Sequence, residues 1–240
     1  MMRLLTWNIR HGGGNRTSDI AHVLVQKTPD VIALNEFRMP RGQRLQNILR
    51  HNGWEHQAIA AAADGVNGVL VAARMPFETA TDHAVPEFCR DRWLEASFRD
   101  ANIKVLAVHI PTFNNADHQK EQFWQAILER AARLQETNTH AVVVGGLNTG
   151  KHRVDETGAT LRCADCFEQM EKAGWVDAWR SRNPTGREYT WFSAKGNGFR
   201  LDHAFLSPAL APRLRSAEYS HQEREEGVSD HSLLIVEFNV

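Results

Sequence analysis

The 240-residue chain is long enough to bury a substantial core, and we expect it to form one α/β domain. Its hydrophobic content of 42% and charged content of 24% exclude an intrinsically disordered protein. Because 28 basic and 29 acidic residues give a net charge of -1, a polyanion would have to bind a local basic patch and not a general positive field.

Three cysteines, Cys89, Cys163 and Cys166, occur in a chain without a secretory signal, which indicates a reducing compartment. Cys163 and Cys166 have the spacing of half a zinc site. No second cysteine pair or His-x3-His accompanies them, so we interpret them as structural. No apolar run approaches the roughly 20 residues that a membrane span needs. We therefore expect a cytoplasmic protein without a membrane span, and the sequence indicates no protein partner.

A strand–helix–strand unit is expected at the start of the chain. It consists of a strand at 2–8, a loop forced by Gly12, Gly13 and Gly14, a helix capped by Ser18, and a buried strand at 31–34. In such a unit both strands point in the same direction, so Asn8 and Glu36 emerge at the same edge of the sheet.

The rest of the chain also alternates strands and helices. We expect a helix at 43–51, an antiparallel meander over 54–98, a strand at 103–110, a long helix at 116–134 capped by Asn114 or Asn115, a strand at 141–145, a helix at 167–173, and strands at 189–192, 200–206 and 232–238. No repeat or linker marks a boundary, so we expect one domain over 1–240. Two sheets packed face to face with helices outside would account for this pattern.

Polar side chains stand repeatedly at strand ends. They are Asn8, Glu36, His109, Asn148 after the glycine turn of Val142–Gly146, Asp202, and Asp230 with His231. Ligand-binding groups of α/β proteins tend to lie at such ends. Their convergence indicates a site suited to metal and phosphate.

A carboxylate at the end of an apolar strand is costly unless its charge is matched, and a divalent cation would match it. Mg²⁺ needs only one or two carboxylates because it retains several waters. Glu36 and Asp230 are therefore the candidate ligands, with Asn8 close by. Alternatively, Glu36 caps a loop or pairs with Arg38.

Asp202 and His231 suit a carboxylate–imidazole pair that holds a phosphate oxygen or protonates a leaving group. His109 is a candidate second phosphate contact, although a histidine on an apolar strand is more often part of the core. Arginines follow Glu36 at Arg38, Arg41, Arg44 and Arg50. They either contact phosphates or form a solvated helix face.

The ordered motifs of the chain resemble those of the endonuclease/exonuclease/phosphatase superfamily. The matching motifs are Thr6-Trp7-Asn8, the strand ending in Glu36, Gly145-Gly146-Leu147-Asn148, Tyr189-Thr190-Trp191, Arg200-Leu201-Asp202 and Ser229-Asp230-His231. The resemblance covers residues 3–238. It implies a four-layer αββα sandwich and Mg²⁺- or Mn²⁺-dependent hydrolysis of a phosphate ester.

The resemblance also implies roles for individual residues. Glu36 and Asp230 would serve the metal, and Asn8 and Asn148 would orient metal and phosphate. His231, held by Asp202, would bind and polarise the scissile phosphate. His109 matches the histidine of the deoxyribonuclease-like and sphingomyelinase-like branches.

The last third of the chain is similar to the exonuclease III branch, which includes abasic-site endonucleases. In that branch, residues matching Trp191, Phe199 and Leu201 wall a pocket for a sugar without its base; the alternative is that all three belong to the core. Arg200, from the same motif, is a further candidate for substrate binding. The resemblance therefore implies abasic or nicked duplex DNA as the substrate.

The chain departs from the superfamily at Gly146, where the pattern Gly-Asp-x-Asn has aspartate. Loss of a positioned base costs about 10²–10⁴-fold in rate. We therefore expect a DNA phosphodiesterase of abasic-site type whose activity is weakened at this position. The alternatives are a phosphatase or phospholipase acting on small phosphoesters or lipids, and a non-catalytic pseudo-enzyme that binds nucleic acid.

Overall fold

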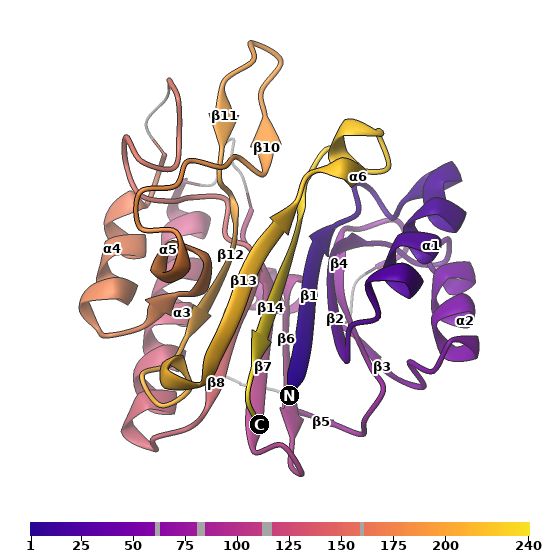
Figure 1. The fold of residues 1–240 in the computed structure, drawn as a ribbon, viewed down its shortest axis with the longest axis horizontal. Coiled ribbons are helices and arrows are strands. Elements are labelled where there is room, and N and C mark those ends of the chain that lie inside the picture. The colour runs from indigo at the N-terminus through magenta and orange to yellow at the C-terminus, as the bar shows by residue number, and fades with distance from the viewer. Residues whose placement is uncertain (61–62, 81–84, 112–116, 159–160) are drawn as a thin grey trace.

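The computed structural model describes residues 1–60, 63–80, 85–111, 117–158 and 161–240. Two six-stranded sheets pack face to face, and helices cover their outer faces (Figure 1). One apolar cluster lies between the two sheets. A second lies between the first sheet and its helices, and a third between the second sheet and its helices. This arrangement confirms the predicted four-layer αββα sandwich.

The first sheet joins strands from both ends of the chain. Its order is β13-β14-β1-β2-β4-β3, where β1 is Met2–Asn8, β2 Val31–Phe37, β3 His56–Ile59, β4 Gly68–Ala73, β13 Leu214–Ser220 and β14 Leu233–Phe238. β1 pairs parallel with β2 and antiparallel with β14. The first strand is therefore central, and the last strand covers its other edge.

The second sheet is formed by the middle of the chain. Its order is β5-β6-β7-β8-β12-β9, where β5 is Glu78–Ala80, β6 Trp93–Phe98, β7 Ile103–His109, β8 Ala141–Gly146, β9 Val176–Asp177 and β12 Asp202–Leu206. β7 and β8 are parallel. A hairpin of β10 (Trp191–Phe192) and β11 (Gly198–Phe199) projects beyond both sheets (Figure 1).

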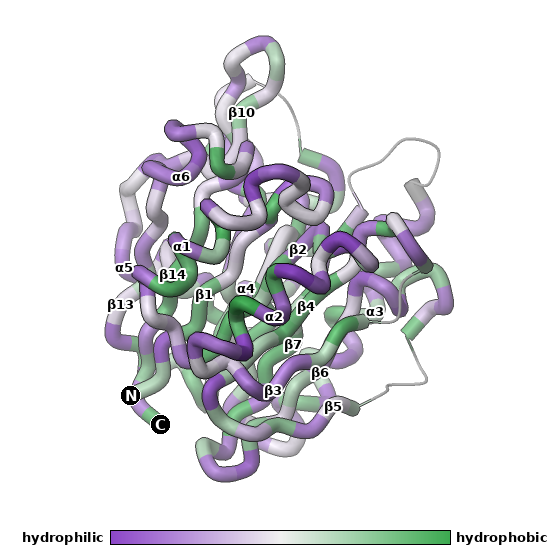
Figure 2. Tube along the Cα trace, turned by 90° about the vertical axis from the view of Figure 1, so that its right-hand side faces the viewer, coloured by the Kyte–Doolittle hydropathy of each residue, from purple (hydrophilic) through white to green (hydrophobic). Residues whose placement is uncertain are grey.

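The helices divide between the two outer faces. α1 (Thr17–Lys27) and α2 (Gln43–His51) lie on the first sheet, and α3 (Asp117–Glu136) and α4 (Ala164–Lys172) lie on the second (Figure 1). The shorter helical segments are α5 (Ala178–Arg182), α6 (Gln222–Glu225), η1 (Gly14–Arg16), η2 (Glu87–Arg92) and η3 (Ala211–Arg213). In Figure 2, strands coloured largely as hydrophobic lie behind α1 and α2, whose colour changes between hydrophilic and hydrophobic along each helix. None of the described helices has the length and apolar character of a membrane span.

Strand alternation explains where the inter-sheet core gives way to polar residues. Val105 and Ala107 of β7 and Val142 and Val144 of β8 all pack in the core between the sheets. Because side chains alternate between faces, the next residues with the same orientation are His109 and Gly146. The polar end of the inter-sheet space is thus built from the last inward positions of the strands.

Several predictions of local structure were wrong. Ser18 does not cap α1, which begins at Thr17 after Arg16 and has no side-chain cap. The expected meander is divided, because β3 and β4 join the first sheet while β5 and β6 join the second. The strand β13 was missed, because its two buried residues, Leu214 and Ala217, do not follow the alternation of a strand. The proposed caps Asn114 and Asn115 lie outside the described residues.

A buried ionic cluster connects three parts of the chain: the loop after β8, strand β9 and the segment immediately before β12. The guanidinium of Arg200 is bidentate with Asp155, at 2.8 and 2.9 Å, and contacts Asp177 at 2.7 Å. Asp177 also caps α5 by accepting from the backbone N–H of Arg180. Burial alone would raise the pKa of Asp177, but Arg200 and His203 lower it far below its usual range.

Replacing Asp177 by Asn should destabilise the fold by about 3–5 kcal/mol, because it leaves a buried arginine with one carboxylate fewer. A carboxylate with a depressed pKa stabilises the fold above its unfolded-state pKa of about 4, and this contribution is lost as the pH falls further. The difference in the free energy of unfolding between wild type and Asp177→Asn should therefore become smaller in acid. Urea unfolding at several pH values measures this difference. The control is Glu78→Gln, whose exposed pair with Arg99 should contribute less than about 1 kcal/mol.

Candidate active site

A pocket of about 340 Å³ opens at the polar end of the inter-sheet space. We call it the site pocket. Its described lining residues are Asn8, Arg10, His11, Glu36, Asn67, Arg92, His109, Pro111, Asn148, Trp191, Leu201, Asp230 and His231. These residues come from strand ends and loops of both sheets. The structure thus brings together most of the residues predicted from the sequence.

Glu36 reaches the pocket through a local irregularity in β2. The pairing of β2 with β4 shifts register between Asn35 and Phe37, and Glu36 has a left-handed φ of 58°. Such bulges redirect a side chain next to a functional site. The Glu36 carboxylate accepts from Asn8 Nδ2 at 3.1 Å and from the His11 backbone N–H at 2.8 Å. The carboxylate is therefore held in a fixed orientation.

The donor set of the pocket fits a hard divalent cation. Glu36 and Asp230 both line it, and their side chains are 15% and 40% exposed. Among the described residues, no group of three or more histidine, cysteine or acidic side chains is arranged to hold a metal. Mg²⁺ takes one or two carboxylates and keeps its waters, so Glu36 and Asp230 are the residues that could hold it. Asn8 Oδ1 accepts from the backbone N–H of Arg10, and Asn8 Nδ2 donates to Glu36.

Asp202 and His231 form the predicted carboxylate–imidazole pair, with 2.8 Å between Oδ2 and Nδ1. Burial alone would raise the pKa of Asp202, but His231 and the Thr190 hydroxyl lower it. Burial would likewise lower the pKa of His231, but Asp202 raises it. The pair therefore favours a carboxylate beside an imidazolium, which can donate a hydrogen bond from Nε2.

His109 lies at the end of β7, next to Gly146 in the register with β8. Its Nδ1 is 3.2 Å from Nη1 of Arg92. Burial lowers the pKa of His109 to about 4, and Arg92 contributes to this shift. The imidazole of His109 is thus neutral near pH 7, whereas the pKa of His231 is shifted in the opposite direction.

Gly146 occupies the gap between His109 and Asp202 across the second sheet. A Cβ atom at this position would lie 3.1 Å from His109 Cδ2 and 3.6 Å from Asp202 Oδ1. The φ of Gly146 lies outside the left-handed range, so the backbone accepts other residues. An aspartate could therefore be introduced here if the His109 ring moved by a few tenths of an ångström.

Asn148 lies in the loop after β8 with a left-handed φ of 51°, and it lines the site pocket. Its Nδ2 donates to the carbonyl of Ile110. The buried ammonium of Lys120, from α3, donates to the carbonyl of Asn148 at 2.7 Å. Helix α3 therefore holds this loop in place as well as covering the sheet.

The predicted apolar wall is only partly present. Trp191 and Leu201 line the site pocket, and the Trp191 ring lies 6.4 Å from that of His231. Phe199 is not among the lining residues and packs against Trp191 at 5.8 Å. The assignment of Arg200 to substrate binding is wrong, because Arg200 is 1% exposed and is engaged by two aspartates.

Asn35, which is fully buried between the sheets, was not predicted from the sequence. Its Nδ2 donates to the carbonyl of Val108 at 3.0 Å, and its Oδ1 accepts from the Gly146 N–H at 2.7 Å. Its alternation with Ala33 toward the inter-sheet core was the available signal. Arg92 was also missed, and nothing in the sequence distinguishes it from the exposed Arg90.

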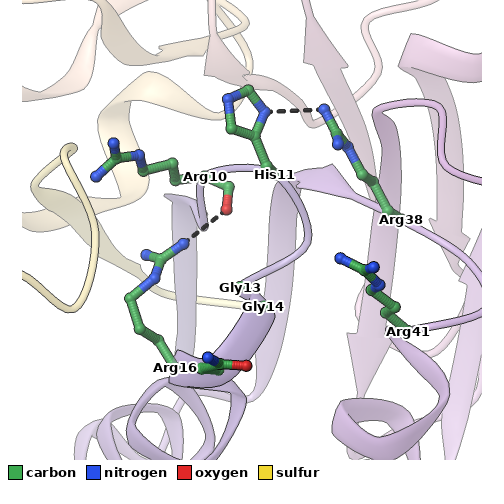
Figure 3. Close-up of a pocket in the computed structure, with 8 residues that line it drawn as sticks. Arg10, His11, Gly13, Gly14, Arg16, Arg38 and Arg41 are labelled. Carbon is green, nitrogen blue, oxygen red and sulfur yellow. Dashed lines mark hydrogen bonds between the residues drawn. The ribbon is translucent and has the colours of Figure 1, made fainter.

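A second, basic pocket adjoins the first, and we call it the arginine pocket. It has a volume of about 490 Å³, and its described lining contains Arg10, Arg16, Arg38 and Arg41 but no carboxylate. These side chains surround the loop at Gly13 and Gly14 (Figure 3). Arg10 and His11 line both pockets.

The arginines of this pocket differ in the hydrogen bonds that hold their side chains. Arg16 donates to the backbone carbonyls of Arg10 and Val228 and so fastens the loop (Figure 3). Arg38 contacts Asn67 and His11. Arg41 is exposed and bonds to no described residue. Arg44 lines a neighbouring cavity, whereas Arg50 bonds to Asn47 on the surface of α2.

Comparison with known proteins places this site in a family. An AP endonuclease from Archaeoglobus fulgidus superposes with a TM-score of 0.84 at 21% identity, over 100% of both chains. Two structures of NExo from Neisseria also match over 100% of both chains: a 3' phosphatase bound to a product DNA hairpin (TM-score 0.86, 24% identity) and a 3'-5' exonuclease from Neisseria meningitidis (TM-score 0.85, 22% identity).

A comparison with curated protein sequences finds no significant match. The model of the endonuclease/exonuclease/phosphatase family matches residues 5–231, which include every strand end that lines the site pocket. The chain therefore belongs to the endonuclease/exonuclease/phosphatase family.

Proposed function

We propose that this protein is a Mg²⁺- or Mn²⁺-dependent phosphodiesterase that hydrolyses DNA at abasic sites. The observation that carries the proposal is the continuity between the site pocket and the arginine pocket through Arg10 and His11. A polyanion can place one phosphate beside the carboxylates and imidazoles and its neighbours against the arginines. A small phosphoester would occupy the site pocket alone and would not reach the arginine pocket. The similarity to an AP endonuclease and to a DNA-bound phosphatase supports the same substrate class.

The side chains of the site pocket suit this reaction. Glu36 and Asp230 would hold the metal, which would neutralise phosphate charge and polarise a water molecule. The imidazolium of His231, oriented by Asp202, would donate to a phosphate oxygen. Trp191 and Leu201 would contact the sugar, since an apolar wall favours a sugar without its base.

Gly146 weakens this machinery because it supplies no carboxylate to orient or deprotonate the attacking water. The position faces the same space as His109 and Asp202. The family motif and the geometry together support a slow enzyme that retains binding of metal and substrate.

Gly146→Asp should raise the rate of cleavage of a duplex with one abasic site by about 10²–10⁴-fold, because it restores a positioned base. Single-turnover cleavage of a fluorescent duplex in Mg²⁺ or Mn²⁺ measures the effect. The matched control is Gly146→Asn, which has the same shape but cannot accept the proton and should give no comparable gain.

Equal rates for the chain and for a folded Gly146→Asp would contradict the missing-base explanation. DNA binding without turnover in either form would favour a pseudo-enzyme. Turnover of small phosphoesters or lipids alone would overturn DNA as the substrate.

Arg41→Gln should weaken binding of abasic duplex and reduce the salt dependence of the binding constant by about one unit of log–log slope, because one phosphate contact is lost. Fluorescence anisotropy at several salt concentrations, with Ca²⁺ in place of Mg²⁺, measures both quantities. The control is Arg50→Gln, which removes an arginine at the far end of α2 and should change neither. An unchanged slope for Arg41→Gln would show that the arginine pocket does not contact the DNA.

A further inference from the structure

Arg92 has a fixed relation to His109 that follows from the pairing of their strands. Arg92 ends η2, immediately before β6, and the register of β6 with β7 places Trp93 opposite Val108. The next pair along the two strands brings Arg92 beside His109. The observed distance of 3.2 Å between Nη1 and Nδ1 agrees with this placement, and both residues line the site pocket.

The chemistry of this contact determines where the imidazole carries its proton. A guanidinium offers only N–H donors, so Nδ1 of His109 must be the acceptor. A neutral imidazole that accepts at Nδ1 carries its hydrogen on Nε2. Nε2 has no hydrogen-bond partner among the described residues, and the adjacent ring atom Cδ2 faces the side chain-free Gly146. The ring therefore carries an N–H donor that no described residue uses, next to the ring atom that faces Gly146.

We propose that Arg92 is a positioning residue that fixes His109 as the neutral Nε2–H tautomer, so that His109 donates a hydrogen bond to a phosphate oxygen and does not accept a proton from the attacking water. His109 consequently does not replace the base that is missing at Gly146. The two histidines of the pocket then act as donors by different means. His231 does so from a ring held by a carboxylate at Nδ1, and His109 from a ring held by an arginine at Nδ1.

The tautomer is a property of the free protein and is tested without activity. In two-bond ¹H–¹⁵N correlation spectra of the full chain labelled at histidine nitrogens, His109 should show the neutral Nε2–H pattern at neutral pH. The His109 signals are assigned by their absence from the His109→Gln spectrum. Arg92→Met should shift them toward the Nδ1–H tautomer, whereas Arg92→Lys, which keeps a donor, should retain the wild-type pattern.

The matched control is Arg90→Met, which removes an exposed arginine from the same segment η2 and should leave the His109 signals unchanged. An Nδ1–H or doubly protonated His109 in the wild type would overturn the proposal. So would an unchanged tautomer in a folded Arg92→Met.

A kinetic readout rests on the proposed phosphodiesterase function. Arg92→Met should lower kcat with little change in KM, by less than the roughly 10²–10³-fold that removal of a whole transition-state donor costs. Arg92→Lys should recover most of this loss. If no form cleaves any phosphoester, the proposed function fails while the spectra still decide the role of Arg92. A raised KM with unchanged kcat and tautomer would identify Arg92 as a simple phosphate contact and overturn the positioning role.

Discussion

The amide of Asn35 joins the two sheets at the point where the active site begins. It satisfies one carbonyl of β7 and one N–H of β8, both buried, from a strand of the opposite sheet. A buried backbone group without a partner costs about 1–3 kcal/mol, so these two bonds fix the separation of the sheets at this level. The carboxylate of the next residue, Glu36, and the imidazole of His109 depend on that separation to face one pocket.

The site also depends on a row of residues across the second sheet. Arg92, immediately before β6, lies beside His109 of β7, and the next positions across the sheet are Gly146 of β8 and Asp202 of β12. Each side chain in the row faces the next one, and Gly146 is the position in the row that has no side chain. At one end of the row, Arg92 adds to the burial that lowers the pKa of His109, and at the other end Asp202 raises the pKa of His231. The register of the strands thus determines which charged side chains lie beside the histidines of the pocket.

Much of the fold was predictable, because buried strands and amphipathic helices have distinct periods; β1 and α2 were predicted with their observed bounds. The convergence of Asn8, Glu36, His109, Asn148, Asp230 and His231 followed from their positions at strand ends and from the family motifs. The bulge at Glu36 and the contacts of Arg92 depend on the exact register of paired strands, which the residue pattern does not reveal. Arg200 was misassigned because a sequence does not reveal which of several aspartates will neutralise an arginine.

The place of β1 between β2 and β14 has a consequence for synthesis of the protein on the ribosome. One edge of β1 pairs with β2, and the other edge pairs with β14, residues 233–238. Asp230 and His231 directly precede β14. An uncovered strand edge invites pairing with other chains. A nascent chain that stops before this point therefore exposes its central strand and lacks two residues of its pocket. Closure of the first sheet and completion of the site therefore depend on the same segment of the chain.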